Sequence, residues 1–361
     1  MKQSCLNRRS LLLGSAAGAA VSFANTASAA ADASKSLPGI RVAEDRITRK
    51  TAGLRPFRPS GFVVGMDRIG DKTLLHNYGH GGCGVTLSWG TADMAVKLAL
   101  QTSYRQAAVI GCGAVGLATA RLLQDRGFDV AIYTKEVPPN TTSNIAAALF
   151  GVTSLVDDAH HTGEIVGRIQ QAARFAHRYF QNFIGERYGV RWIDFFLIGD
   201  QPQEQPWDFA ITPELYPLTV IAPADNPFPV NYASRFPTMF IETNIYLPQI
   251  LSDFLLRGGQ LHVRDFADRA ELAEIAAPLI VNCTGLGAKA LFGDDELTPV
   301  KGQLTLLLPQ RELDYVYLDG AKELYMFPRR DAVILGGSHE HGVWSAQLDD
   351  IQAMRIFEGH R

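Results

Sequence analysis

The stretch from Ala107 to Glu136 constrains the fold more than any other part of the chain. It begins with four apolar residues, continues into a GxGxxG pattern at residues 111–116, and then shows a helical apolar period that ends near Gly127. A second apolar segment follows at residues 129–133. This order predicts a βαβ unit, in which the glycines let a pyrophosphate approach the free N–H groups at the helix N-terminus.

The context of the glycine pattern decides how much it says about function. A bare GxGxxG is weak, and an ordinary glycine-rich turn is the alternative. Here a strand precedes the pattern, a helix follows it, and the acidic residue Glu136 stands twenty residues after Gly116. We therefore predict a dinucleotide site at the turn, formed by Gly111, Cys112, Gly113, Ala114, Val115 and Gly116.

The position of this unit is unusual, because a βαβ unit of this kind usually opens a domain and here 106 residues precede it. The length of 361 residues allows two domains with cores of their own. A net charge of −3 gives no electrostatic reason to expect nucleic acid or an anionic membrane as a partner.

The first residues have the features of an export signal. Arg8 and Arg9 precede an apolar run at residues 11–23, and Ala27-Ser28-Ala29 resembles a cleavage site. The run is too short for a good membrane span. We predict a twin-arginine-type signal over residues 1–29, with an ordinary secretory signal as the alternative, and hence a periplasmic or secreted protein. Residues 30–50 are predicted to form a tether.

Two Arg-Pro pairs, Arg55-Pro56 and Arg58-Pro59, follow the tether. Proline holds the preceding residue extended, so both arginines are expected on a strand-like segment. Fixed guanidinium groups suit capture of a carboxylate, and the alternative is that both are ordinary surface arginines.

Residues 74–90 contain five glycines and cannot form a regular strand or helix throughout. A helix is expected from Thr91 to Leu100, so the glycine loop again presents backbone N–H groups and allows close approach of a planar ligand. His76 and His80 have no third ligand at suitable spacing, and the cysteines are dispersed. We therefore predict neither a metal site nor a disulfide framework.

The segments TAGLRPFRP and HNYGHGGCGVTLSWGTA closely resemble the C-terminal signature of the D-amino-acid oxidase family of FAD-dependent flavoproteins. The resemblance implies that Arg55 binds the substrate carboxylate and that the carbonyl of Gly82 faces the substrate amine. It also implies flavin contacts from the loop residues Gly81, Gly82, Gly84, Val85 and Thr86.

Further cofactor residues are implied by three other segments. The run Thr141-Thr142-Ser143 resembles the family's flavin-binding hydroxyl triplet, although a helix cap is the alternative. Ala148 and Phe150 replace the glycine and tryptophan that flank Leu149 in the family pattern. Lys135 occupies the position of the ribose-binding acid, with Glu136 next to it, and the segment VNCTG places Thr284 near the adenosine half.

The C-terminal third supplies the other predicted substrate residue. Tyr325 matches the family tyrosine whose hydroxyl meets the substrate carboxylate, and simple packing is the alternative. The family's second active-site tyrosine falls at Ala321. The run 339–341, His-Glu-His, is predicted to be a turn. Residues 201–237 are expected to be a long loop of the substrate domain, acting as a lid or as a structural excursion.

The predicted fold class is α/β. A Rossmann-like FAD-binding domain comprises residues 51–160 and 258–298, and a substrate domain with a mainly antiparallel sheet comprises residues 161–257 and 299–361. The resemblance implies oxidative deamination of a D-amino acid, with hydride transfer from Cα to flavin N5. Oxygen then reoxidises the flavin and gives hydrogen peroxide, a 2-oxo acid and ammonia. An exported dehydrogenase with another electron acceptor and a flavin-binding protein without turnover are the alternatives, and a homodimer is compatible with the sequence.

The order of the segments also predicts a rearranged chain. In the resembled family the βαβ unit starts the chain and the arginine and glycine-loop segments finish it, whereas here that order is rotated. Circular permutation is tolerated where chain ends lie close together. We therefore expect Arg55, Gly82 and Gly111 to converge on one flavin, and residues near Ile40 to lie close to Arg361.

Overall fold

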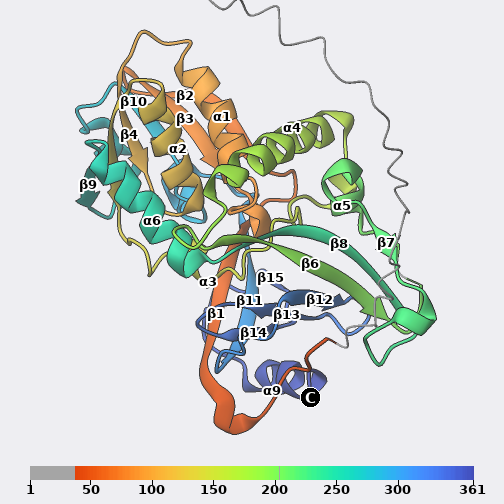
Figure 1. The fold of residues 1–361 in the computed structure, drawn as a ribbon. Helices are drawn as coiled ribbons and strands as arrows, with labels where there is room; N and C mark the ends of the chain where they lie inside the picture. Colours follow the sequence, from red (N-terminus) through yellow and green to blue (C-terminus); the bar gives the residue numbers. More distant parts are fainter. Residues whose placement is uncertain (1–36, 203) are drawn as a thin grey trace, which may run out of the picture. The chain divides into compact units, whose positions relative to one another are not determined.

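The computed structural model describes residues 37–202 and 204–361. The predicted signal at residues 1–29 lies outside the described residues. Residues Leu37–Arg361 form one unit that contains two β-sheets (Figure 1). Among the helices of this part of the chain, none is both long and apolar enough to cross a bilayer.

The first sheet has six strands and contains the predicted βαβ unit. Its order is β2-β3-β10-β4-β5-β9. All neighbours in it are parallel except β2, which runs antiparallel to β3 at the edge. The strands are β2 (Val63–Ile69), β3 (Lys72–Tyr78), β4 (Gln106–Ile110), β5 (Asp129–Thr134), β9 (Gln260–Val263) and β10 (Leu279–Asn282).

Helices cover both faces of the six-stranded sheet. Ala107 and Val109 of β4 pack in one apolar cluster with α1 (Ser88–Ala99) and α2 (Ala114–Asp125), and α6 (Thr243–Leu256) packs in the same cluster. Ala108 and Ile110 point the other way and pack with residues of α7 (Arg269–Ala273) and α8 (Gly287–Phe292). This alternation follows from the two-residue period of a strand and explains why β4 is apolar on both faces.

The second sheet has nine strands in the order β1-β11-β14-β13-β12-β6-β8-β7, with β15 beside β11. Its neighbours are antiparallel except for the parallel pair β12 and β6. The strands are β1 (Ile47–Phe57), β6 (Val190–Gly199), β7 (Thr219–Val220), β8 (Tyr232–Ile241), β11 (Thr298–Leu307), β12 (Tyr315–Asp319), β13 (Leu324–Pro328), β14 (Val333–Gly336) and β15 (Glu340–His341). The predicted α/β class with a mainly antiparallel second sheet is confirmed.

Helix α9 (Asp350–Gly359) packs on one face of the nine-stranded sheet, where Ile356 and Phe357 share a cluster with Met326 and Leu335. The opposite face packs against α3 (Thr142–Ile145) and the residues that follow it. The remaining helices are α4 (Gly163–Phe180) and α5 (Trp207–Ala210).

The N-terminal part of the described chain differs from the prediction. Residues 37–50 are packed and do not form a free tether, because Leu37, Ile40 and Val42 lie against the cluster that contains Ile356 and Phe357. Strand β1, expected from residue 51 in the FAD-binding part, belongs instead to the nine-stranded sheet. The contact between the Ile40 region and α9 meets the geometric expectation of the rotated order, which itself stays a prediction.

Three further boundaries differ from the expected ones. The glycine-rich stretch begins as a strand, because β3 continues to Tyr78. Helix α1 begins three residues before Thr91, at Ser88. The predicted long loop at residues 201–237 contains the short helix α5 and the short strand β7, and β8 already begins at Tyr232.

Ala148 has a backbone φ of +51°, one of three positive values among non-glycine residues of the described chain. An L side chain in this region costs about 1–2 kcal/mol. The strand-like pairing of Leu149 with Phe240 and the bond from the Ile241 N–H to the Ala148 carbonyl, 2.9 Å long, hold this conformation.

We expect Ala148→Gly to raise the free energy of unfolding by about 1 kcal/mol, because glycine adopts positive φ without strain. Ala147→Gly is the matched control and should lower it, since Ala147 has no such strain to lose. Urea unfolding of flavin-stripped protein measures both variants. A loss of stability in Ala148→Gly equal to that in Ala147→Gly would contradict the interpretation.

Candidate active site

The predicted dinucleotide turn lies between β4 and α2, and packing accounts for two of its three glycines. Gly111 has φ +113°, and a Cβ there would lie 2.5 Å from the carbonyl oxygen of Cys283. A Cβ on Gly116 would overlap the carbonyl oxygen of Gly111. The first glycine therefore permits the tight turn, and the last permits close packing of α2 against β4 and β10.

The N-terminus of α2 receives a hydroxyl from α3. The backbone N–H of Ala114 donates to Ser143 Oγ over 3.0 Å, and a Cβ on Gly113 would also lie 3.0 Å from that oxygen. Thr141 donates instead to Asn144 Oδ1, at 2.7 Å, and Thr142 is exposed. Only one member of the predicted hydroxyl triplet therefore touches the glycine turn.

The ends of β5 and β10 complete this edge of the sheet. Thr284 donates its hydroxyl to Asn282 Oδ1 at 2.7 Å, directly after β10. Lys135 and Glu136 are both exposed after β5, so the structure brings both to the edge. The carboxyl ends of parallel strands are where open α/β sheets bind ligands.

The predicted glycine loop is packed against residues 153–154. The N–H of Gly82 donates to the carbonyl of Ser154 over 3.2 Å, and a Cβ on Gly81 would overlap that carbonyl. Cys83 makes two bonds to the backbone of Thr153, of 2.7 and 2.9 Å. Glycine is thus needed here for close approach of the protein's own backbone, and Gly82 keeps an exposed face.

Two further residues of this segment are buried, although the resemblance implies that they contact the flavin. Val85 and Thr86 are buried, and the Thr86 hydroxyl donates towards the carbonyls of Leu149 and Gly151, at 3.2 and 3.0 Å. Thr86 therefore ties the glycine loop to the segment that contains Ala148 and Leu149. Gly84 has more space, because a Cβ placed on it would have only the His80 Cβ nearby, at 3.9 Å.

The two histidines of the loop are held by separate partners. The Nε2 atom of His80 lies 2.9 Å from Thr91 Oγ1, and burial lowers its pKa to about 3. His76 bonds to Asn282 through Nδ1 at 3.0 Å. Across residues 37–202 and 204–361, no group of three or more His, Cys, Asp or Glu side chains is placed to hold a metal ion.

Arg55 and Tyr325 lie on the same face of the nine-stranded sheet. Strand pairing places Gly53 opposite Gly302, Leu304 opposite Gly336, and Gly336 opposite Tyr325. Directly paired residues point to the same face, so Gly53, Gly302 and Gly336, together with Leu304, form a floor beneath the two side chains.

The two side chains lean over that floor from opposite sides. The guanidinium of Arg55, from β1, lies over Gly302, where a Cβ would come within 2.7 Å of Nη2. The ring of Tyr325, from β13, lies over Gly336. Ile145 of α3 lies over Gly53, with 2.9 Å between its Cγ2 and the position of a Cβ. The predicted carboxylate-binding pair is therefore brought to one surface.

The Arg55 Nη1 atom is buried and has no hydrogen-bond partner among residues 37–202 and 204–361. Arg58 is the opposite case, because it pairs with Asp294 at 3.0 Å and with Glu296 at 3.2 Å. Of the two arginines predicted to bind a carboxylate, Arg55 therefore has a guanidinium nitrogen left without a partner in the described part of the chain, whereas Arg58 is already paired. A buried guanidinium nitrogen without a partner is a place for a ligand oxygen.

Three residues near Arg55 were not found from the sequence. His339 lies 3.2 Å from Ser154 Oγ, and burial, the charge of Arg55 and His341 together lower its pKa to about 4. Burial raises the pKa of Asp208 to about 6, and the N–H of Ser154 opposes that shift. Ser154 itself has φ +52°. The sequence signal was the His-Glu-His run, which was predicted to be a turn, whereas its last two residues form β15 (Glu340–His341).

Contacts between neighbouring segments link the two sheets around this region. Pro56, next to Arg55, lies 3.9 Å from the Cβ position of Gly285 after β10. Phe57 lies 3.3 Å from the Cβ position of Gly81. Gly111 packs against Cys283. The structure therefore gathers Arg55, the glycine loop and the dinucleotide turn, although their roles as ligands stay predictions.

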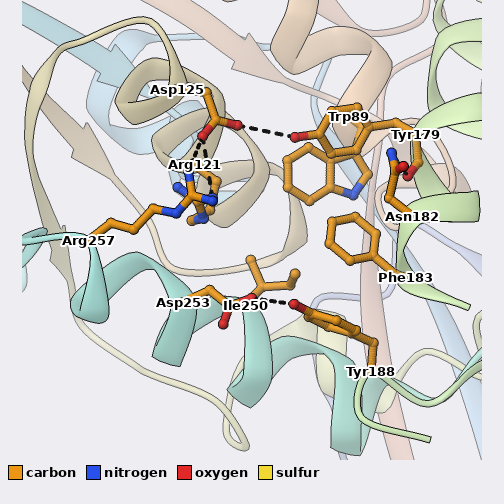
Figure 2. A pocket seen from close by; sticks show the side chains of 10 residues that line it. All are labelled: Trp89, Arg121, Asp125, Tyr179, Asn182, Phe183, Tyr188, Ile250, Asp253 and Arg257. Carbon is orange, nitrogen blue, oxygen red and sulfur yellow. Dashed lines mark hydrogen bonds and ion pairs between the residues drawn. The ribbon is translucent and has the colours of Figure 1, made fainter. Parts of the chain in front are cut away.

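A separate hollow of about 280 Å³ lies among α1, α2, α4 and α6 (Figure 2). Its charged side chains are already paired: Asp125 accepts from Tyr179 at 3.2 Å, and Asp253 accepts from Tyr188 at 2.8 Å. None of the predicted site residues lines it. The predicted active site at Arg55 is therefore separate from this hollow.

The dinucleotide turn gives a direct test. We expect Gly116→Ala to abolish binding of a dinucleotide cofactor, because the new methyl group would overlap the Gly111 carbonyl and push α2 away from the turn. Gly167→Ala, in α4, is the matched control, because nothing lies within 4 Å of its Cβ position. Flavin absorbance of the purified proteins measures the result, and a yellow Gly116→Ala protein would contradict it.

The residues present at the turn fit the pyrophosphate half of such a cofactor. The positive φ at Gly111, the close approach at Gly113 and the N-terminus of α2 form the cradle that a pyrophosphate needs. Ser143 and the backbone of Ala114 are the groups at its mouth. Thr284 and residues 135–136 lie at the ends of the neighbouring strands.

Comparison with known proteins agrees with this geometry. A D-amino-acid oxidase from Rubrobacter xylanophilus is 29% identical over 260 residues, which cover 70% of this chain and 74% of that protein. A D-amino acid oxidase from Dugesia ryukyuensis is 27% identical over 261 residues, covering 70% and 75%. The solved glycine oxidase from Bacillus cereus, 16% identical, shares the fold with a TM-score of 0.54 over 71% of this chain and 77% of its own. The DAO family model, described as FAD dependent oxidoreductase, matches residues 7–98 and 106–358. The chain therefore belongs to the DAO family of FAD-dependent oxidoreductases.

Proposed function

We propose that the protein oxidatively deaminates a D-amino acid, giving a 2-oxo acid, ammonia and hydrogen peroxide. The observation that carries the proposal is the buried, unpartnered Nη1 of Arg55 on the glycine floor beside Tyr325. The D-amino-acid oxidases to which the chain is similar support the choice of substrate class.

Arg55 and Tyr325 would bind the substrate carboxylate. A guanidinium offers two parallel N–H donors to a carboxylate, and Nη1 is free to supply one of them. The Tyr325 hydroxyl can supply another donor from the opposite side of the floor. Bound FAD would supply the two-electron redox chemistry at this site. The protein's task is then to hold the substrate in one orientation.

The amine end would be bound by the glycine loop. Gly82 keeps an exposed face while its N–H is used by Ser154, which leaves the Gly82 carbonyl as the acceptor that the resemblance assigns to the substrate amine. Two fixed points, the carboxylate at Arg55 and the amine at Gly82, define which face of Cα meets the cofactor. With the cofactor position as the third constraint, only one enantiomer directs its Cα–H towards the cofactor.

Anaerobic reduction of the purified yellow protein by a panel of D- and L-amino acids tests the substrate class. We expect D-amino acids to bleach the flavin and their L-enantiomers to leave it oxidised. Admission of oxygen should then restore the colour with formation of hydrogen peroxide. Bleaching without reoxidation by oxygen would favour the dehydrogenase, and failure of every amino acid to bleach the flavin would contradict the proposal.

We expect Arg55→Met to raise the KM of the best D-amino acid while FAD stays bound. Losing a buried charge-assisted partner costs about 2–5 kcal/mol, so the KM should rise on the order of 30-fold or more. The same substitution removes a buried unpaired charge, so the melting temperature should not fall. Arg49→Ala, an exposed position on the same strand, is the control and should change neither quantity. An unchanged KM in Arg55→Met would refute the role of Arg55.

A further inference from the structure

His339 stands beside the predicted carboxylate site. It precedes β15, whose His341 is paired with Val300, and Val300 is paired with Arg55. The rings of His339 and His341 lie 4.8 Å apart, and His341 contacts Phe57 at 5.3 Å. His339 therefore lies on the same face of the sheet as the guanidinium of Arg55.

A hydrogen-bonded chain connects His339 to the glycine loop. Its Nε2 lies 3.2 Å from Ser154 Oγ, and the carbonyl of the same Ser154 accepts the N–H of Gly82 over 3.2 Å. The Nδ1 of His339 has no hydrogen-bond partner in the described part of the chain. With Nε2–H donating to Ser154, Nδ1 is left as a free acceptor.

A zwitterionic amino acid bound at this site must lose a proton before it can be oxidised. Its nitrogen arrives as an ammonium group, and a carbon attached to an ammonium group does not give up a hydride readily, because the nitrogen has no lone pair to stabilise the product. One N–H proton must therefore leave before the Cα–H bond breaks. Among the neighbouring carboxylates, Glu340 pairs with Lys301 at 3.8 Å, and Asp208 faces the backbone N–H of Ser154.

We propose that Nδ1 of His339 accepts the proton that the substrate ammonium group loses before oxidation. One ammonium N–H bond breaks, one imidazole N–H bond forms, and the positive charge moves from the substrate to His339. Ser154 would fix the ring through Nε2, as a positioning residue. The proposal rests on the proposed function, because it assumes an amino acid bound between Arg55 and Gly82.

The electrostatics of the site suit this role. Burial, the charge of Arg55 and the neighbouring His341 lower the pKa of His339 to about 4, so the free enzyme holds it neutral at neutral pH. A carboxylate bound to Arg55 offsets that charge, and the pKa of His339 should then rise. A bound substrate carboxylate therefore makes proton acceptance by His339 less unfavourable than it is in the free enzyme. The other charged groups beside His339 are Lys322, Glu323, Glu340 and Arg355.

The pH dependence of kcat/KM tests the proposal. With a base of low pKa, the ammonium form of the substrate reacts, so the wild-type profile should be flat from about pH 5 to about pH 8. In His339→Gln only the free-amine fraction reacts, so kcat/KM should rise about tenfold per pH unit and lie on the order of 100-fold below wild type near pH 7. His341→Gln is the matched control and should keep the flat profile. An unchanged flat profile in His339→Gln would overturn the proposal.

A second measurement does not depend on turnover. Trifluoroacetate, a carboxylate without an amine that stays ionised near pH 5, is added to weakly buffered holoenzyme at that pH, and a pH indicator reports proton uptake. Wild type and His341→Gln should take up a fraction of one proton, whereas His339→Gln and Arg55→Met should take up none. Equal uptake in wild type and His339→Gln would overturn the link between His339 and Arg55. If no amino acid reduces the flavin, the proposed function fails while this coupling can still be measured.

Discussion

The half-buried guanidinium of Arg55, whose buried Nη1 has no partner in the described part of the chain, is the constraint on which the site depends. Taking a guanidinium even partly out of water without an anion costs free energy, and a fold retains such a group only where surrounding packing enforces it. Strand β1 enforces it here, because pairing with β11 along ten residues fixes Arg55 over Gly302. Arg58, three residues later, is neutralised by Asp294 and Glu296 and serves to hold the structure.

The site also depends on glycines, because their missing side chains allow backbone segments around the two sheets to lie in direct contact. Gly111 and Gly116 bring the turn and α2 against β10, and Gly81 admits the carbonyl of Ser154. Gly302 and Gly336 supply the floor under Arg55 and Tyr325. Glycine therefore acts in two ways. In the turns it allows positive φ or close packing, and in the sheet its missing side chain leaves room for Arg55 and Tyr325.

Much of this arrangement could be predicted from the sequence. The strand–turn–helix–strand order around Gly111 carries a strong local pattern, and Arg55 was placed on an extended segment because a proline follows it. The shared face of Arg55 and Tyr325 was implied by the family resemblance and by no local pattern, since it depends on the register of four strands, of which β1 lies far from the other three in the chain. A register shift of one residue would turn either side chain to the opposite face.

The residues that were missed share one physical property. His339 and Ser154 lie in irregular segments, and their importance comes from contacts across 185 positions of sequence that no local pattern encodes. Thr86 was predicted to touch the flavin because it lies in a recognised motif, yet its hydroxyl is used to hold residues 149 and 151. Sequence motifs therefore located the site, but tertiary contacts determine which of its side chains are already hydrogen-bonded within the protein.

The central claim is that the unpaired face of Arg55 receives the carboxylate of the substrate. A crystal structure of the FAD-bound protein with propionate tests it most directly. We expect one carboxylate on the glycine floor, with one oxygen bonded to Arg55 Nη1 and the Tyr325 hydroxyl within hydrogen-bonding distance. A carboxylate bound elsewhere, or an Arg55 guanidinium paired with an acidic side chain of the protein itself, would contradict the claim.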